Sequence, residues 1–151
     1  MITLLLRQQR LSRARTLALT DLRCLSHRDL ELHVAAVLDA LPGWRAQATR
    51  GSSDQGADVI ATSPTQVIVA IQVKHYPQRN VGNKAVQEIV ASKAIYRASE
   101  AVVFTSGPGY TASARELAKA NGVRLWTPRD LFELQAKAQS DPPLRTDLLP
   151  T

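Results

Sequence analysis

The chain has 151 residues, of which 44% are hydrophobic and 21% charged, a composition typical of a soluble globular protein with one core. Its single cysteine excludes an internal disulfide and a zinc site built on several thiolates, and it fits a cytoplasmic location. No apolar run reaches the roughly 18 residues that cross a bilayer, so no membrane partner is expected. The net charge of +6 favours a polyanionic partner, with nucleic acid first, although many proteins are basic only for solubility.

The first twenty residues contain four arginines and no acidic residue. Such a segment is compatible with an organelle transit peptide, with a basic arm that lies along phosphates, or with a start placed too far upstream. We favour a basic arm or a helical extension. Residues 1–25 are therefore predicted to form a basic N-terminal extension.

Apolar spacing and turn residues predict the elements that follow. A helix begins at the N-cap Ser26 and is stopped by Pro42-Gly43. Two of the strands, separated by Ser63-Pro64-Thr65-Gln66, should form an antiparallel hairpin. In chain order we expect a helix over 26–41, strands over 44–49, 58–62 and 67–74, a helix over 83–96, a strand over 101–105, a helix over 111–121, a strand over 123–126, and a last helix after Thr127.

A hairpin followed by alternating helices and strands predicts an α/β fold, with a mixed β-sheet flanked by helices and the core order α-β-β-β-α-β-α-β. Residues 26–139 should form this domain, and residues 140–151, which contain three prolines, should form a flexible C-terminal tail. The fold class does not by itself identify a function.

The strand over 67–74 changes character along one face. Its odd-numbered positions are all apolar, whereas the other face becomes polar at Gln72 and Lys74. Strands that simply leave the core often end this way. If the turn is centred on Thr65, however, Asp58 lies directly opposite Gln72, with Lys74 on the diagonal of the same face. A carboxylate, an amide and an ammonium would then converge, provided that the register does not shift by one residue.

Glu31 lies at the border of the apolar stripe of the helix over 26–41. A carboxylate buried there is costly unless a cation or hydrogen-bond donors compensate it, and the alternative is that Glu31 reaches solvent. The three histidines, His27, His33 and His75, do not have the spacing of zinc ligands, so no zinc site is expected.

Several segments together resemble a known family. Gly56-Ala57-Asp58-Val59-Ile60 and then Gln72-Val73-Lys74, with Glu31 on the preceding helix, resemble the Mrr-type branch of the restriction-endonuclease-like nucleases. The resemblance extends over about residues 29–134. In the superfamily the pattern is Asp, then Glu or Asp, a spacer and Lys, and the Mrr branch commonly has glutamine in the middle position, as at Gln72. Further segments match in order at 53–56, 83–90, 103–105 and 125–131.

The resemblance implies a restriction-endonuclease-like fold and a divalent-metal-dependent DNA endonuclease that hydrolyses phosphodiester bonds. Asp58, the side-chain oxygen of Gln72 and the Val73 carbonyl would hold Mg²⁺ or Mn²⁺, which prefer oxygen ligands. Lys74 would orient the attacking water and stabilise the developing negative charge, and Glu31 would act in the outer shell. Because Gln72 replaces a carboxylate, metal affinity should be weaker than in the superfamily pattern.

Contacts with DNA are expected around the end of the same strand, at His75, Tyr76, Arg79 and Lys84. A solvated strand end and ordinary helix-surface charges explain these residues as well. Mrr restriction proteins usually carry an additional DNA-recognition domain, for which we see no room, so DNA shape, a separate recognition partner or dimerisation would select the substrate. A cut through both strands needs two active sites, which makes a homodimer plausible.

Two other functions stay open. One is a structure-selective nuclease, such as a Holliday-junction resolvase. The other is a non-catalytic nucleic-acid-binding module that keeps the fold but does not hold metal.

Overall fold

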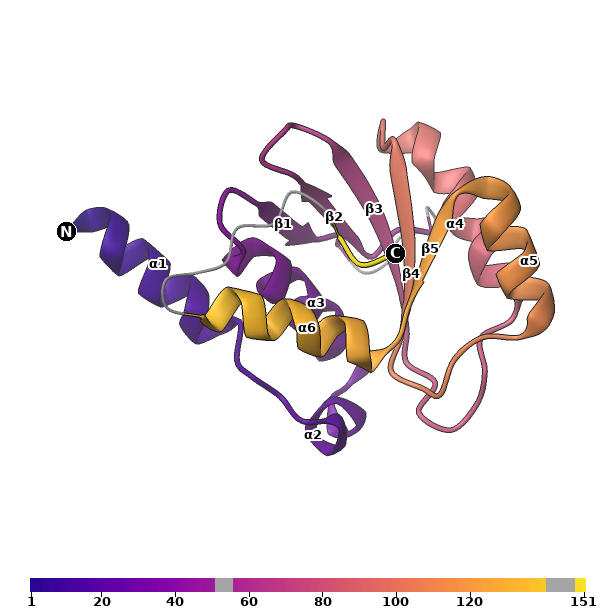
Figure 1. Ribbon diagram of the computed structural model, residues 1–151, viewed down its shortest axis with the longest axis horizontal. Coiled ribbons are helices and arrows are strands. Elements are labelled where there is room, and N and C mark those ends of the chain that lie inside the picture. Colours follow the sequence, from indigo (N-terminus) through magenta and orange to yellow (C-terminus); the bar gives the residue numbers. More distant parts are fainter. Residues whose placement is uncertain (51–55, 141–148) are drawn as a thin grey trace.

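The computed structural model describes residues 1–50, 56–140 and 149–151. Figure 1 shows the helices and strands along the chain. They are α1 (Ile2–Arg13), α2 (Leu19–Cys24), α3 (His27–Ala40), β1 (Arg45–Ala48), β2 (Val59–Thr62), β3 (Ile68–Lys74), α4 (Asn83–Ile95), β4 (Glu100–Thr105), α5 (Ala112–Asn121), β5 (Val123–Trp126) and α6 (Pro128–Gln139).

The strands form one mixed sheet in the order β1-β2-β3-β4-β5. β1, β2 and β3 are antiparallel neighbours, whereas β3, β4 and β5 are parallel. Parallel neighbours need a crossover connection, which α4 and α5 supply. The predicted α/β class and the core order α-β-β-β-α-β-α-β, which runs from α3 to β5, are confirmed.

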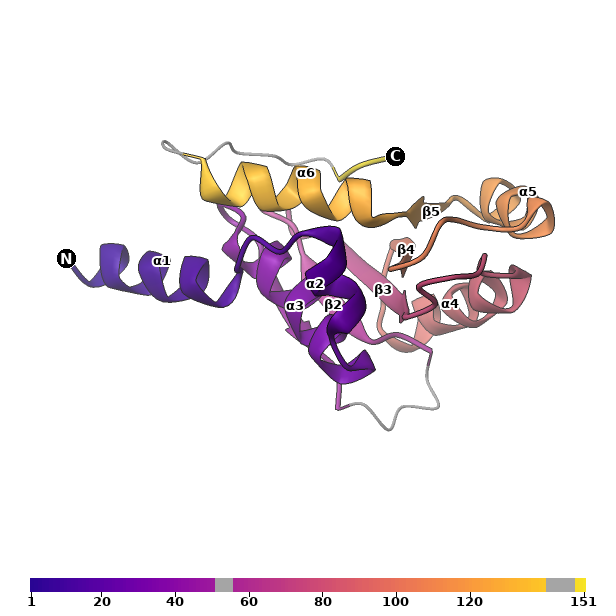
Figure 2. The same ribbon diagram turned by 90° about the horizontal axis from the view of Figure 1, so that it is seen from below.

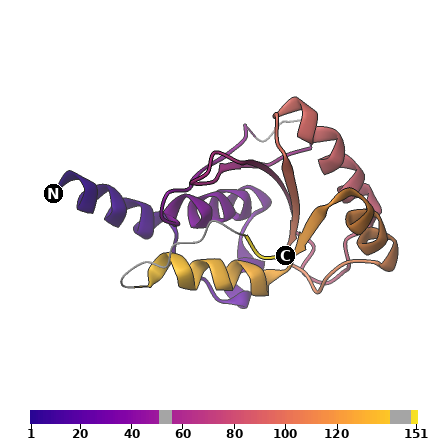
Figure 3. The ribbon, with the colours of Figure 1, turned by 45° about the horizontal axis from the view of Figure 1, so that its top comes forward.

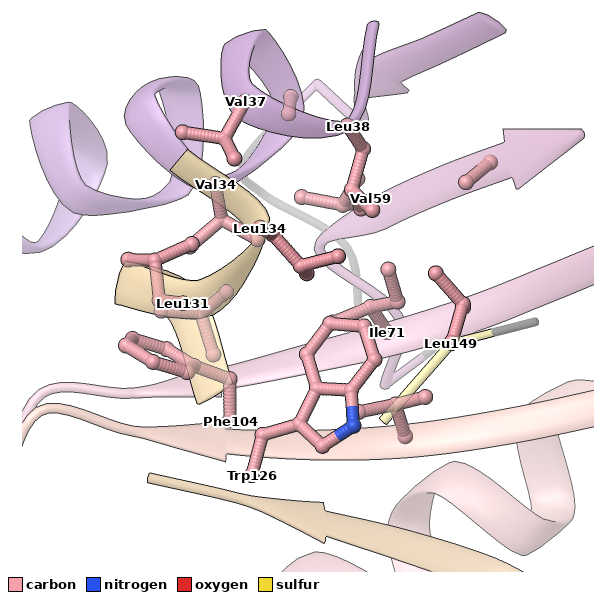
Figure 4. Close-up of a cluster of buried hydrophobic side chains, with 14 of the residues drawn as sticks. Val34, Val37, Leu38, Val59, Ile71, Phe104, Trp126, Leu131, Leu134 and Leu149 are labelled. Carbon is pink, nitrogen blue, oxygen red and sulfur yellow. The ribbon is translucent and has the colours of Figure 1, made fainter. Parts of the chain in front are cut away.

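Helices cover both faces of the sheet, with α3 and α6 on one side and α4 and α5 on the other (Figures 2 and 3). We call the buried residues between the sheet, α3 and α6 the α3 layer, and those between the sheet, α4 and α5 the α4 layer. Figure 4 shows the α3 layer, in which Phe104 and Trp126 pack against Leu131 and Leu134. These four side chains are fully buried, and burying each contributes roughly 1.5–3 kcal/mol.

Local signals in the sequence set the helix ends. The Ser26 hydroxyl accepts a hydrogen bond from the Asp29 amide at 3.0 Å and starts α3. Gly122 ends α5 in the left-handed conformation, with φ of 65°. At α6, Pro128 occupies the first turn, and the Asp130 carboxylate accepts from the Thr127 amide at 2.8 Å. The boundaries predicted for the elements from residue 26 to residue 126 differ from the observed ones by at most one residue.

The two ends of the chain differ from the prediction. Ala14 and Leu22, in the predicted extension, are fully buried in the α3 layer. Leu149, in the predicted tail, is 5% exposed in the same layer, and the Trp126 indole donates to the Pro150 carbonyl at 2.9 Å. Packing against apolar side chains outweighs the loose character that prolines suggest, so the packed unit extends beyond residues 26–139 on both sides. The rest of the predicted tail, 141–148, lies outside the described residues.

Among the described helices, α1 alone has no buried residue, and it extends away from the body of the molecule (Figures 1 and 2). A basic helical extension is one of the two alternatives that the sequence favours. No helix in the described part of the chain combines the length and the apolar character that crossing a membrane requires.

Candidate metal and active site

The candidate site lies where β2 and β3 separate. Their pairing runs from Thr62 opposite Ile68 to Val59 opposite Ile71, which confirms the register expected from a turn centred on Thr65. The Asp58 amide then donates to the Ile71 carbonyl at 2.8 Å, so two consecutive residues face Ile71, as in a β-bulge. The predicted direct pairing of Asp58 with Gln72 is therefore wrong, because the extra residue ends the ladder one position earlier.

Beyond the bulge, β3 continues for three residues alongside β4. The Lys74 carbonyl accepts from the Ser106 amide at 3.1 Å, on the β4 side. Backbone groups alternate in direction along a strand. The N–H and C=O groups of Val73 therefore point away from β4, to the edge of β3 along which β2 no longer pairs. There the Val73 amide donates to Asp58 Oδ2 at 2.7 Å, and the His27 ring Nε2 lies 3.1 Å from the Val73 carbonyl oxygen. Two side chains thus take the place of a neighbouring strand.

Glu31 joins these groups from α3. One ligand atom from each of His27, Glu31 and Asp58 lies within 4.8 Å of the others. Glu31 is only 6% exposed, and its Oε1 is 3.4 Å from His27 Nε2, while Arg28 donates to its Oε2 at 2.8 Å. Of the two sequence alternatives for Glu31, the buried and compensated one is observed.

The surroundings of Asp58 disfavour its charged form. Partial burial raises the pKa of Asp58, and the negative charge of Glu31 raises it further. The hydrogen bond from Val73 and the positive charges of His27 and Lys74 lower the pKa but do not compensate fully. Two carboxylates in a poorly solvated position favour a bound cation, which would relieve both effects.

Gln72 and Lys74 are held by a residue that sequence analysis did not single out, Glu88 on α4. Glu88 Oε2 accepts from Gln72 Nε2 at 2.6 Å and lies 3.3 Å from Lys74 Nζ. Partial burial alone would raise the pKa of Glu88, but Gln72 and Lys74 together hold that pKa below its usual value. The contacts of the predicted cluster therefore form two sets, one among Asp58, Glu31 and Val73 and one that joins Gln72 and Lys74 to Glu88, and the charge of Lys74 still reaches Asp58.

The Gln72 side chain is 4% exposed, and its Oε1 has no hydrogen-bond partner among the described residues. A carboxylate can only accept, so Glu88 determines which end of the amide is the nitrogen. Leaving a buried acceptor unpaired costs about 1–3 kcal/mol, and such atoms commonly mark a ligand position.

A close backbone contact connects α4 to the segment that leads into Asp58. Gly56 has φ of +81°, and a side chain there would meet Ser92 Oγ at 2.5 Å and the Glu88 carbonyl oxygen at 2.9 Å. Only glycine fits this position. The helix that carries Glu88 is thereby placed directly against the approach to Asp58, whereas the predicted turn residues 53–55 lie outside the described part of the chain.

The residues that are predicted to contact DNA differ in the exposure of their side chains and in the contacts that restrain them. His75 is tied to the protein, because its Nε2 lies 2.8 Å from the Leu25 carbonyl oxygen and its Nδ1 lies 2.7 Å from Ser106 Oγ. The Arg79 guanidinium lies over the Tyr76 ring, 4.1 Å from its centroid. The Lys84 side chain is 86% exposed. Contact of these residues with DNA stays a prediction.

Two residues of the site, His27 and Glu88, were missed from sequence. His27 is four residues before Glu31 and so lies on the same helix face, a signal that a search for zinc spacing overlooks. Glu88 follows a crossover connection, and no local spacing relates it to Gln72.

Comparison with protein families connects this geometry to known proteins. The Mrr_cat family, described as restriction endonuclease, matches residues 22–135. The chain belongs to this family. The Mrr_cat match includes α3 and extends into α6, so the whole sheet and every residue of the candidate site lie within the nuclease-type domain. A comparison with curated proteins gave no match.

Solved structures share the fold of this Mrr_cat domain. MspJI restriction endonuclease, in complex with a 27-mer oligonucleotide, is 24% identical over 80% of this chain, with a TM-score of 0.56. The DNA modification-dependent restriction endonuclease AspBHI is 22% identical over 90% of the chain, with a TM-score of 0.50. Protein VC1899 from Vibrio cholerae is 16% identical over 72%, with a TM-score of 0.53. The chain covers 31%, 35% and 32% of these three proteins, respectively.

Proposed function

We propose that this Mrr_cat domain is a divalent-metal-dependent DNA endonuclease that hydrolyses phosphodiester bonds. The observation that carries the proposal is the separation of β2 from β3, which gathers Asp58, Glu31 and the Val73 carbonyl beside the β3 segment that carries Gln72 and Lys74.

The residues present fit a hard divalent ion such as Mg²⁺ or Mn²⁺. Asp58, Gln72 Oε1 and the Val73 carbonyl offer oxygen ligands, and Glu31 adds a second carboxylate. A cation would stabilise the Gln72 oxygen, which has no hydrogen-bond partner among the described residues, and it would relieve the raised pKa of Asp58. When bound, a divalent ion supplies positive charge against the phosphate and makes water a stronger nucleophile.

The roles of the protein groups follow from their contacts. Lys74 projects from the end of β3, and Glu88 restrains its ammonium group, which would orient the attacking water and stabilise negative charge on the phosphate. The Val73 amide holds Asp58 in place. Glu31, fixed by Arg28 and close to His27, would orient water next to the metal ligands.

DNA as substrate is supported by the net charge of +6 and by the oligonucleotide bound to MspJI, which shares the fold. Exposed Arg79 and Lys84 flank the strand end and are suited to phosphate contacts. A homodimer would supply the second active site for a double-strand cut, and a separate recognition partner would supply sequence preference.

The test is cleavage of plasmid, single-stranded, branched and methylated DNA with and without Mg²⁺ or Mn²⁺. Asp58→Ala should abolish cleavage, and Lys74→Ala should slow it by roughly 10² or more, as expected when a positioned charge is removed. DNA affinity should change little in Lys74→Ala, because many basic groups share phosphate binding. Lys137→Ala on α6 is the control, since Lys137 pairs with Glu133 away from the site.

Preference for four-way junctions over linear DNA would favour the resolvase alternative. If the wild type cuts none of these substrates and binds neither ion, the protein is a non-catalytic DNA-binding module.

A further inference from the structure

We propose that His27 is a nitrogen ligand of the metal ion in this site, and that the site therefore binds Mn²⁺ in preference to Mg²⁺. The inference rests on the proposed function only for the existence of a metal site. It assigns one metal ligand in addition to Asp58, Gln72 and Val73.

The position of the imidazole carries the first step. His27 Nε2 lies 3.1 Å from the Val73 carbonyl oxygen and 3.4 Å from Glu31 Oε1, and Asp58 completes a group within 4.8 Å. In an octahedral site with bonds of about 2.1–2.2 Å, neighbouring ligand atoms lie about 3 Å apart. The separations of His27 Nε2 from the Val73 oxygen and from Glu31 Oε1 are therefore close to the edges between ligands around one ion, and Asp58 lies within reach of the same position.

Hydrogen bonding gives the second step. A carbonyl oxygen only accepts, so Nε2 must carry the proton that it shares with Val73, and Glu31 lies on the same side of the ring. This proton lies among several oxygen atoms. A cation would be most stabilised at the same position. To hold an ion through Nε2, His27 would have to release this proton, either to Nδ1 through the other tautomer or to solvent, which would free the Nε2 lone pair.

The helix supplies the third step. His27 and Glu31 are separated by one turn of α3, which keeps both side chains on one face. The His27 side chain is 53% exposed whereas that of Glu31 is 8% exposed, so the histidine can adjust to an entering ion while the carboxylate stays fixed.

Ligand chemistry then decides which ion is preferred. Mg²⁺ binds oxygen and keeps most of its waters, whereas imidazole suits transition-metal ions. Replacing one oxygen ligand by a histidine nitrogen should shift the site towards Mn²⁺.

Titration calorimetry with Mn²⁺ and with Mg²⁺, in the absence of DNA, tests this preference. We expect the wild type to bind Mn²⁺ at least about tenfold more tightly than Mg²⁺, and His27→Ala to weaken Mn²⁺ binding on the order of tenfold with little change for Mg²⁺. His75→Gln is the matched control, because His75 bonds to Leu25 and Ser106 rather than to the cluster. Circular dichroism verifies that each variant is folded.

Pulsed electron paramagnetic resonance of bound Mn²⁺ provides a direct readout. Coupling to an imidazole ¹⁴N should be present in the wild type and in His75→Gln and absent in His27→Ala. Absence of this coupling in the wild type, or an equal weakening of both ions in His27→Ala, overturns the assignment. Nitrogen-coupled Mn²⁺ without DNA cleavage would contradict the proposed function alone, whereas Mg²⁺-dependent cleavage without nitrogen coupling would contradict the histidine ligand alone.

Discussion

Asp58 occupies a position that costs the folded protein stability as long as its carboxylate is charged. Burial and the neighbouring Glu31 raise its pKa, so the folded state binds this proton more tightly than the unfolded chain does. For a group of this kind, the stabilisation is present at low pH and is lost as the pH rises through the folded-state pKa. Residues that bind metal commonly carry such a cost.

Asp58→Asn should therefore raise the melting temperature at about pH 8 while abolishing cleavage. The asparagine cannot ionise, yet its side-chain oxygen can still accept the hydrogen bond from Val73. Each 1 kcal/mol of added stability corresponds to about 2–4 °C for a chain of this size. Calorimetric melting of the wild type and of Asp58→Asn at about pH 8 and pH 4 checks this prediction. The increase in melting temperature should be smaller at the lower pH. If Asp58→Asn melts at a lower temperature than the wild type at the higher pH, the explanation is contradicted.

We predict that Glu88 influences the proposed reaction through its contacts with Gln72 and Lys74. Its carboxylate fixes both the amide and the ammonium group, so Glu88→Ala should release them together. Loss of a residue that orients ligands typically costs about 10–100-fold in metal affinity or activity. Cleavage rate and Mn²⁺ affinity should both fall within this range, and Glu88→Asp should recover part of each.

Glu133→Ala is the matched control for Glu88→Ala. Glu133 also forms an ion pair with a lysine four residues away, but on α6 and with a side chain that is 53% exposed. Equal effects of the two substitutions would show that a general loss of surface charge, and not the contacts of Glu88, is responsible.

At the scale of elements, periodicity and turn residues predicted the strands and helices, and the turn at Thr65 predicted the β2–β3 register. The prediction failed at Asp58, because a bulge adds one residue that no alternation of apolar and polar residues announces. Glu88 could not be predicted, since crossover geometry alone brings α4 beside the end of β3. The roles of Gln72 and Lys74 still stand as predictions.

A buried polar side chain on α6 connects that helix to α3 and to the segment after α1. Gln135 on α6 accepts from the His33 ring at 2.7 Å and donates to the Leu17 carbonyl at 3.1 Å. Burial lowers the pKa of His33 below its usual 6.5, the hydrogen bond to Gln135 opposes this, and the positive charge of Arg15 adds to it. The unfolded chain therefore binds the His33 proton more readily than the folded protein.

Stability should consequently fall as the pH drops below 6.5, and His33→Gln should remove this part of the pH dependence. The folded state disfavours protonated His33, so its contribution is complete above the unfolded-state pKa and is lost below it. Urea unfolding of both proteins between about pH 8 and pH 5 gives the difference. Parallel curves for the two proteins over this range would contradict the prediction.

For the whole molecule, α1 is the most exposed feature. Ile2, Leu4, Leu5 and Leu6 are 52–75% exposed, and Arg10 contacts the body through Asp39 at 3.7 Å. This helix, Ile2–Arg13, forms the first part of the predicted extension 1–25, and its contact with DNA stays a prediction.

Deleting residues 1–12 should weaken DNA binding and spares Ala14, which is fully buried. The deletion removes Arg7 and Arg10, so the slope of log affinity against log salt should become less steep by about 0.9 for each phosphate that the protein no longer neutralises. Fluorescence anisotropy with labelled duplex DNA at several salt concentrations measures both effects. An unchanged slope would show that α1 does not touch DNA.

A variant that keeps the helix separates charge from shape. Arg7→Ala should lower the slope by itself if its guanidinium contacts phosphate. Weaker binding after deletion but not after Arg7→Ala would assign the effect to Arg10 or to the apolar side chains of α1.

The division of the core into two layers has a spectroscopic consequence. Both tryptophans of the chain, Trp44 and Trp126, are buried in the α3 layer. Tryptophan fluorescence will therefore report on the loosening of that layer and not on the α4 layer, whose unfolding can be followed through amide exchange in α4 and α5. If the two signals change at different denaturant concentrations, the sheet separates two units that unfold independently. The candidate site joins α3 to α4 across β3, so it will lose its geometry at the first of these transitions.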